Sequence, residues 1–234
     1  MSNKFEDQFT IRSIHIITFL LLIGSIISFI LLKTNPSPMV TNVAAGFFTS
    51  FVMMFIQTLI EWRTYSKLEA LTKLKIKHVL HSRDNKAHYE RLLTKTAKEV
   101  LVLGTTASRF IEDFAHATRS DSQSLLPVLA KNVPIKILLP KSHFLEADDR
   151  SRAEIARRRM SELKSQYPNF QVRYFEHPAT HSLVKLDDEC LVGPIFPKVK
   201  SKDSPTIHTS ADSPFVQEYL NYFHQEWQNA SEAP

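Results

Sequence analysis

The stretch HSLVKLDDECLVG, residues 181–193, decides how the second half of the chain folds. Its apolar residues stand in short runs, which predicts strands over residues 181–187 and 189–193. Residues 170–176 precede them as another predicted strand. Short segments of this kind, following one another closely, indicate a sheet.

Strands and helices alternate on the N-terminal side of this stretch. The run VLVL, residues 100–103, is short, continuous and apolar and ends at Gly104, which is typical of a buried strand. Residues 134–139 predict a second strand in the same way. Helical patterns fill the intervals: they cover residues 105–119, 122–131 and 149–167, and one more begins at a cap on Ser82 or Asp84 and runs to Lys98.

The C-terminal side of the stretch ends in a helix. Ser213 followed by Pro214 is an N-cap with proline at the first helical position, which predicts the helix start. Aromatic residues then recur every four positions, at Phe215, Tyr219, Phe223 and Trp227. Strands that alternate with helices in this order predict an α/β sandwich with helices covering the sheet, forming one domain over residues 82–234.

Residues 181–193 resemble the signature of the phospholipase D superfamily, His-x-Lys-x-x-x-x-Asp on a strand and turn, followed by a strand that ends Gly-Ser-x-Asn. The resemblance covers residues 85–230 and includes the ending Tyr-x-x-Tyr-Phe-x-x-x-Trp over residues 219–227. It implies the fold of that superfamily. In active members the histidine attacks a phosphodiester and the lysine stabilises charge on the phosphoryl oxygens.

The motif is incomplete in this chain. His181 and Asp188 stand at the matching positions, but Leu183 replaces the lysine and Pro194 the serine. Loss of such a charge clamp costs about 100-fold or more in rate, which favours a non-catalytic domain. If the domain is active, Lys185 is the candidate replacement, on the same face of the strand and about 6 to 7 Å along it. The catalytic residues would then be His181, Lys185 and Asp188.

Two further segments are candidates for binding a phosphate-bearing ligand. Residues 104–108, GTTAS, lie where a strand passes into a helix, and backbone N–H groups and hydroxyls can hold an anion there; a plain capped turn is the alternative. The polar residues 198–213 follow the strands that carry His181 and can reach the same cleft. The predicted ligand-binding residues are Thr105, Thr106, Ser108, His208 and Ser210.

Other charged groups carry less information. Arginines crowd the helix predicted over residues 149–167 and would recognise phosphates or a charged partner, or simply form a solvated face. They are Arg150, Arg152, Arg157, Arg158 and Arg159. The sequence has no metal-ligand spacing, and we expect no metal and no cofactor. The one cysteine, Cys190, excludes an intrachain disulfide and suits a reducing compartment.

The first quarter of the chain is of a different kind. Residues 13–32 and 39–60 are two apolar runs without Asp, Glu, Lys or Arg, and each matches the roughly 20 residues that a helix needs to cross a bilayer. The connector of residues 33–38 is short and contains two prolines, so the helices should be antiparallel neighbours. A signal peptide followed by a core helix is the alternative, but no small-residue cleavage site follows the first run. We therefore predict a transmembrane hairpin over residues 1–61.

Basic residues set the orientation of this hairpin. They follow the second run closely, whereas the connector has only Lys33, so both termini should lie in the cytoplasm at a bacterial inner membrane. Residues 62–81 continue without Gly or Pro and predict a basic helical stalk attracted to anionic membrane lipid. The net charge of +5 needs no nucleic acid to explain it, and nucleic-acid binding stays open.

The whole arrangement, two membrane helices and a small cytoplasmic sensor, resembles the membrane effectors of bacterial phage-defence systems. The resemblance implies a homo-oligomer whose hairpins perturb the inner membrane when a phosphate-bearing ligand, or a partner protein from the same operon, triggers the cytoplasmic domain. Small residues spaced four apart, such as Gly24 and Ser28, favour self-association. The alternatives are a membrane-bound phosphodiesterase or nuclease, active as a dimer that shares two copies of His181, and a structural anchor.

Overall fold

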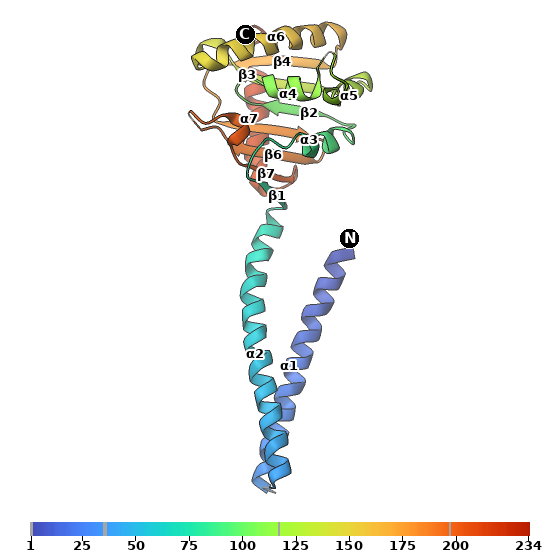
Figure 1. The fold of residues 1–234 in the computed structure, drawn as a ribbon, viewed down its shortest axis with the longest axis vertical. Coiled ribbons are helices and arrows are strands. Elements are labelled where there is room, and N and C mark those ends of the chain that lie inside the picture. Colours follow the sequence, from blue (N-terminus) through green and yellow to red (C-terminus); the bar gives the residue numbers. More distant parts are fainter. Residues whose placement is uncertain (1, 35–36, 117, 197) are drawn as a thin grey trace. The chain divides into compact units, whose positions relative to one another are not determined.

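The computed structural model describes residues 2–34, 37–116, 118–196 and 198–234. The chain divides into two compact units, a helical unit, Met1–Ala70, and a sheet unit, Leu71–Pro234. Figure 1 shows the helices of the first and the layered sheet of the second.

The helical unit consists of α1 (Ser2–Thr34) and the greater part of α2 (Pro38–Lys73). Gly24 on α1 faces the ring of Phe47 on α2 so closely that a Cβ at residue 24 would lie 2.8 Å from the Phe47 Cδ1. The hydroxyls of Thr18 and Thr58 lie 3.4 Å apart. These two contacts run in opposite senses along the helices, so α1 and α2 pack antiparallel.

Large apolar side chains cover the outside of this unit. Among the described residues, one helical segment, Pro38–Ile60, is long and apolar enough to cross a membrane, with 23 residues and a mean hydropathy of 1.9. The apolar segment found in α1 is shorter, Ile17–Leu31. The first predicted span begins at residue 13, and the side chains of residues 13–16 lie outside the described set.

A seven-stranded mixed sheet forms the centre of the sheet unit, in the order β1-β7-β6-β5-β2-β3-β4. β2, β3 and β4 run parallel, and the other neighbouring pairs are antiparallel. The strands are β1 (Ile76–Leu80), β2 (Val100–Leu103), β3 (Ile135–Pro140), β4 (Phe170–Phe175), β5 (His181–Leu186), β6 (Glu189–Pro194) and β7 (Thr206–Ser210). The predicted mixture of helices around a sheet is confirmed.

Helices cover both faces of this sheet and enclose two apolar cores. One face packs against α3 (Lys86–Leu93), α4 (Ser108–Phe114), α5 (Leu126–Ala130) and α6 (Ala147–Gln166). The other packs against α7 (Pro214–Asn229), which begins as predicted because the Ser213 side chain accepts a hydrogen bond from the Phe215 N–H. Short 3₁₀ turns lie at Ser120–Ser122, Ser142–Phe144 and Ser201–Asp203.

The stalk prediction is wrong at its C-terminal end. α2 stops at Lys73, and Ile76–Leu80, which was expected to be helical, forms the edge strand β1. Lys75 has a positive φ of 51°, which an α-helix cannot accommodate. β1 then pairs with β7, so the sheet unit begins at Leu71 and not at residue 82.

Other helix limits also differ from the predictions. The helix expected to begin at Ser82 or Asp84 begins after Asn85, whose side chain accepts the His88 N–H. The helices expected over residues 105–119 and 122–131 shorten to α4 and α5. β7 was not predicted at all because its sequence, TIHTS, is polar.

Candidate active site

His181 is the first residue of β5 and packs against α7. Its ring centroid lies 5.0 Å from that of Tyr219 and 5.1 Å from that of Tyr222. The Nδ1 atom lies 3.1 Å from the Thr180 hydroxyl, and the buried Nε2 atom has no hydrogen-bond partner among the described residues. Burial, and then the positive charge of Arg83, lower the pKa of His181. The imidazole is therefore neutral near pH 7 and keeps one uncommitted nitrogen.

Leu183, at the position of the motif lysine, belongs to the apolar core. It is 0% exposed and packs in the cluster that α7 forms with this face of the sheet, together with Val216 and Phe223. Alternation along β5 puts residues 181 and 183 on the same face. The face that carries the histidine therefore continues directly into a dry core, where a lysine charge would be costly.

Lys185 and Asp188 do not join His181. Four residues at about 3.3 Å each separate residues 181 and 185 by about 13 Å, so the expected 6 to 7 Å was wrong. The Lys185 ammonium forms an ion pair with Glu99 instead. Asp188 lies in the exposed turn between β5 and β6 and pairs with Lys98 at 2.9 Å. The motif residues thus occupy opposite ends of one strand.

The turn of residues 104–108 leaves the sheet at the end of the strands where His181 lies, because Leu103 pairs with Leu183 in register. This end of the strands is called the His181 edge. The hydroxyls of Thr106 and Ser108 lie 2.9 Å apart, and the Ser108 N–H donates to Thr106 at 3.3 Å. These bonds are local, and no side chain caps α4, whose N-cap residue Ala107 has a positive φ of 49°. Thr105, Thr106 and Ser108 are each partly exposed.

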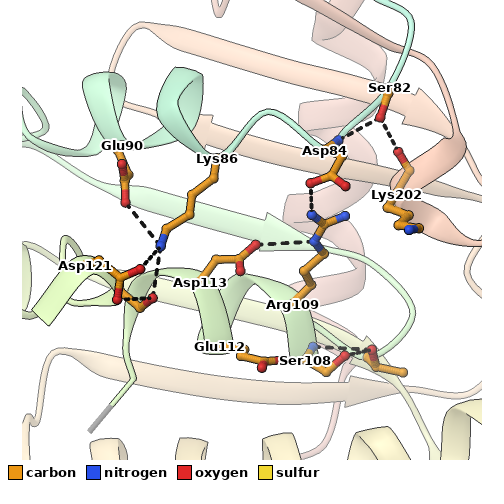
Figure 2. A network of polar contacts seen from close by, with 12 residues as sticks. Ser82, Asp84, Lys86, Glu90, Ser108, Arg109, Glu112, Asp113, Asp121 and Lys202 are labelled. Atoms are coloured by element: carbon orange, nitrogen blue, oxygen red, sulfur yellow. Dashed lines mark hydrogen bonds and ion pairs between the residues drawn. The ribbon is translucent and has the colours of Figure 1, made fainter. Parts of the chain in front are cut away.

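Charged groups beside this turn are paired with one another (Figure 2). Arg109 on α4 contacts Asp84, and its Nε atom lies 3.3 Å from the Asp113 carboxylate. Lys86 on α3 lies 3.3 Å from Asp121 and 3.7 Å from Glu90. The network links α3, α4 and the loop before α3, and its cations are largely neutralised by these acids.

Arg83 is a cation near His181 that the sequence did not indicate. Its Nε atom donates to the Thr206 hydroxyl at 3.0 Å, and its Nη2 atom donates to the carbonyl of Pro194. Pro194 stands directly opposite His181 in the β5–β6 register. Arg83 reaches this edge because β1 delivers the loop that carries it, and β1 was predicted as helix.

Gly193 matches the glycine of the Gly-Ser-x-Asn strand ending, and close packing explains why this position has no side chain. A Cβ at this position would lie 2.3 Å from the backbone oxygen of Pro205, so a larger residue would displace the chain that enters β7.

His208 and Ser210 are not at this edge. His208 is 3% exposed and is enclosed by His88 and Glu189. Ser210 ends β7 at the opposite edge, where its hydroxyl donates to the Asp212 carboxylate at 2.6 Å. No group of three or more metal-ligating side chains occurs among the described residues.

No protein-family model and no curated protein matches the chain. Among solved structures it is similar to TrmBL2, an archaeal chromatin protein with a described mode of DNA binding, at 15% identity and a TM-score of 0.46 over 82% of this chain and 70% of that one. It is also similar to Nuc from Salmonella typhimurium, a phospholipase D family member, at 11% identity and a TM-score of 0.43 over 65% of this chain and 94% of that one. The similarity to NucT from Helicobacter pylori has 12% identity and a TM-score of 0.42 over 64% of this chain and 91% of that one.

Proposed function

We propose that this chain is a membrane-anchored, non-catalytic phospholipase D-like protein. Its sheet unit senses a phosphate-bearing ligand or a partner protein from the same operon, and its two helices act on the bacterial inner membrane as a homo-oligomer when that unit is triggered. Both termini lie in the cytoplasm. The observation that carries the loss of catalysis is Leu183, which is 0% exposed in the core where the motif needs a lysine.

The distribution of charge around His181 supports binding without turnover. Lys185 and Asp188 are committed to Glu99 and Lys98 at the far end of β5, so no described motif cation faces the histidine. Arg83, bonded to Thr206 and Pro194, supplies positive potential near His181, and the partly exposed turn of residues 104–108 leaves the sheet at the same end of the strands. A positive edge with hydroxyls can hold a phosphate group without attacking it.

The exposed apolar surface of the helical unit supports the membrane role. Met39, Phe29 and Phe48 expose 77%, 71% and 61% of their surface. Many such side chains on one pair of helices are unusual for a soluble monomer, and a bilayer or another copy of the helices would cover them. Phage defence is the cellular role that this architecture suggests.

The test uses the full chain, because a fragment that starts at residue 82 would lack β1. Purified protein is incubated with bis-p-nitrophenyl phosphate, DNA and phospholipid, and we expect no turnover. Turnover that His181→Ala abolishes and the exposed control His224→Ala retains would overturn the non-catalytic assignment.

A second assay addresses the membrane. Inducible expression of the full chain, alone and with its genomic neighbours, should depolarise the cells or slow their growth. If neither happens under any of these conditions, the effector role is wrong and simple anchorage is left.

The second candidate function is a dimeric membrane-bound phosphodiesterase or nuclease. The neutral His181 with its uncommitted Nε2 atom favours it, since a nucleophilic imidazole needs an unprotonated nitrogen. The turnover assay decides between the two, with nucleic acid among its substrates.

A further inference from the structure

Three histidines from three elements lie together in the sheet unit, away from His181; two of them are buried and His78 is exposed. His78 comes from β1, His88 from α3 and His208 from β7. The ring centroids of His88 and His208 lie 4.9 Å apart, and His78 stacks on His208 at 5.6 Å. His88 and His208 are 8% and 3% exposed, so water does not solvate their ring nitrogens freely.

The hydrogen bonds of this cluster form a chain in which each group donates to the next, from Arg91 to Glu189. The Nη2 atom of Arg91 lies 3.1 Å from the Nδ1 atom of His88 and can only donate, so that nitrogen accepts. The proton of His88 is then on Nε2, which donates to the Nδ1 atom of His208 at 3.1 Å. His208 in turn carries its proton on Nε2 and donates to the Glu189 carboxylate at 2.7 Å. Both imidazoles are neutral when the chain of bonds is complete.

Protonation of either histidine would break this chain. A proton on Nδ1 of His88 would oppose the Arg91 guanidinium, and one on Nδ1 of His208 would oppose the Nε2–H of His88. The groups that face the pair are His78 and Lys77 from β1, Tyr89 and Arg91 from α3, and Glu189 from β6. The carboxylate of Glu189, which also pairs with Lys77, acts to raise the pKa of His208, but burial outweighs it and the net shift is downward.

Burial is the largest cause that lowers the pKa of both His88 and His208. A lowered pKa means that the folded state resists a proton that the opened state accepts near pH 6.5. The bonded arrangement is therefore fully stable above about pH 6.5 and is weakened as the pH falls below that value.

Two side chains of β1 contact the cluster, in addition to the backbone pairing of β1 with β7. β1 is an edge strand whose neighbour is β7, and its Lys77 and His78 side chains are the ones that reach Glu189 and His208. Two residues separate β1 from the end of α2, and the Thr209 hydroxyl, lying 3.1 and 2.8 Å from the carbonyls of Leu74 and Lys75, fixes that connection. Release of β1 would loosen the point where the chain leaves α2.

We propose that His88, His208 and Glu189 form a pH-sensitive latch that keeps β1, and with it the connection to α2, docked on β7 at neutral pH and releases it on acidification. The inference does not depend on whether the sheet unit is catalytic. It assigns a role to buried histidines that the His181 edge does not use.

Hydrogen–deuterium exchange on the full chain in detergent micelles tests this. Exchange of the β1 peptide is measured at pH 7.5 and 5.5, normalised to the unfolded-chain rate at each pH, with the interior strand β3, which lies between β2 and β4, as internal reference. We expect opening of β1 to increase about tenfold at pH 5.5 while β3 stays protected, because protonation favours the open state locally. An unchanged ratio between β1 and β3 would overturn the latch.

Variants separate this latch from general acid sensitivity. Glutamine can accept through its carbonyl and donate through its amide without titrating, so the double variant His88→Gln, His208→Gln should keep β1 protected at pH 5.5. The exposed control His224→Gln should respond as the wild type does. A double variant that still opens with acid would place the sensor elsewhere; if it does not fold, the wild-type comparison decides alone.

Discussion

Phenylalanines in the two units face opposite surroundings. In the helical unit Phe19, Phe29 and Phe48 expose 61%, 71% and 61% of their surface, whereas in the sheet unit Phe170, Phe175 and Phe223 expose 1%, 2% and 0%. Two helices that pack only on each other leave the rest of their apolar segments uncovered, but a sheet with helices on both faces can enclose its apolar side chains. The sheet unit therefore carries its own core, whereas the helical unit leaves large apolar side chains uncovered.

The largest expected effect comes from a charge placed in the sheet core. Leu183→Lys restores the motif lysine, yet we expect it to destabilise the sheet unit by about 4 to 7 kcal/mol, the range for a fully buried lysine whose pKa falls by about 3 to 5 units. Denaturant unfolding of the full chain, followed by tryptophan fluorescence, measures this. Leu183→Met, the control of similar volume, should cost less than about 1.5 kcal/mol. A stable, hydrolytic Leu183→Lys protein would contradict the assignment.

The same kind of change in the helical unit should act differently. Phe48→Lys adds a charge near the middle of Pro38–Ile60 and should disfavour insertion by about 2.5 to 3.5 kcal/mol, with no effect on the unfolding of the sheet unit. The fraction retained in membranes after alkaline extraction measures it, with Phe48→Leu as control. Full retention of the lysine variant would argue against a membrane-spanning α2.

Two glycines sharpen the comparison within the helical unit. A Cβ at Gly24 meets the Phe47 ring at 2.8 Å, whereas a Cβ at Gly46 meets nothing within 4 Å. Gly24→Ala should therefore weaken the contact between α1 and α2, by about 1 kcal/mol, and Gly46→Ala should not. Thermal unfolding in detergent, together with a spin-label distance between the helices, measures both. Equal behaviour of the two variants would mean that α1 and α2 pack through other faces.

A fall in pH should destabilise the sheet unit and leave the helical unit unchanged, and this is the smallest of the expected effects. The pKa values of His88, His181 and His208 are lowered, in each case mainly by burial, so the unfolded chain takes up protons near pH 6.5 that the folded sheet unit resists. Stability of the sheet unit should fall as the pH drops below about 6.5. Residues 17–60 contain no His, Asp or Glu, so their helicity should not change. A denaturation midpoint that rises between pH 7.5 and 5.5 would reverse the sign of this argument.

The sequence predicted only part of the fate of the catalytic motif. The replacement of its lysine by Leu183 is visible in the letters, but the fate of Lys185 is not, because its ion pair joins it to Glu99, 86 positions away. The same is true of Arg83, whose partners Thr206 and Pro194 are brought to it by the sheet. Side chains that share one edge through pairing of distant strands leave no local pattern.

By itself the sequence determined the elements that carry their own apolar signal. β2 to β6, α6 and α7 were found close to their observed limits, since a run of buried residues or a capped helix start acts locally. Tertiary structure alone decided β1 and β7: IKHVL follows the helix without Gly or Pro and was predicted as part of it, and TIHTS is too polar to predict a strand. Their polar groups are satisfied by one another and by α3 and β6, and a segment whose bonds are all supplied by distant partners takes its conformation from those partners.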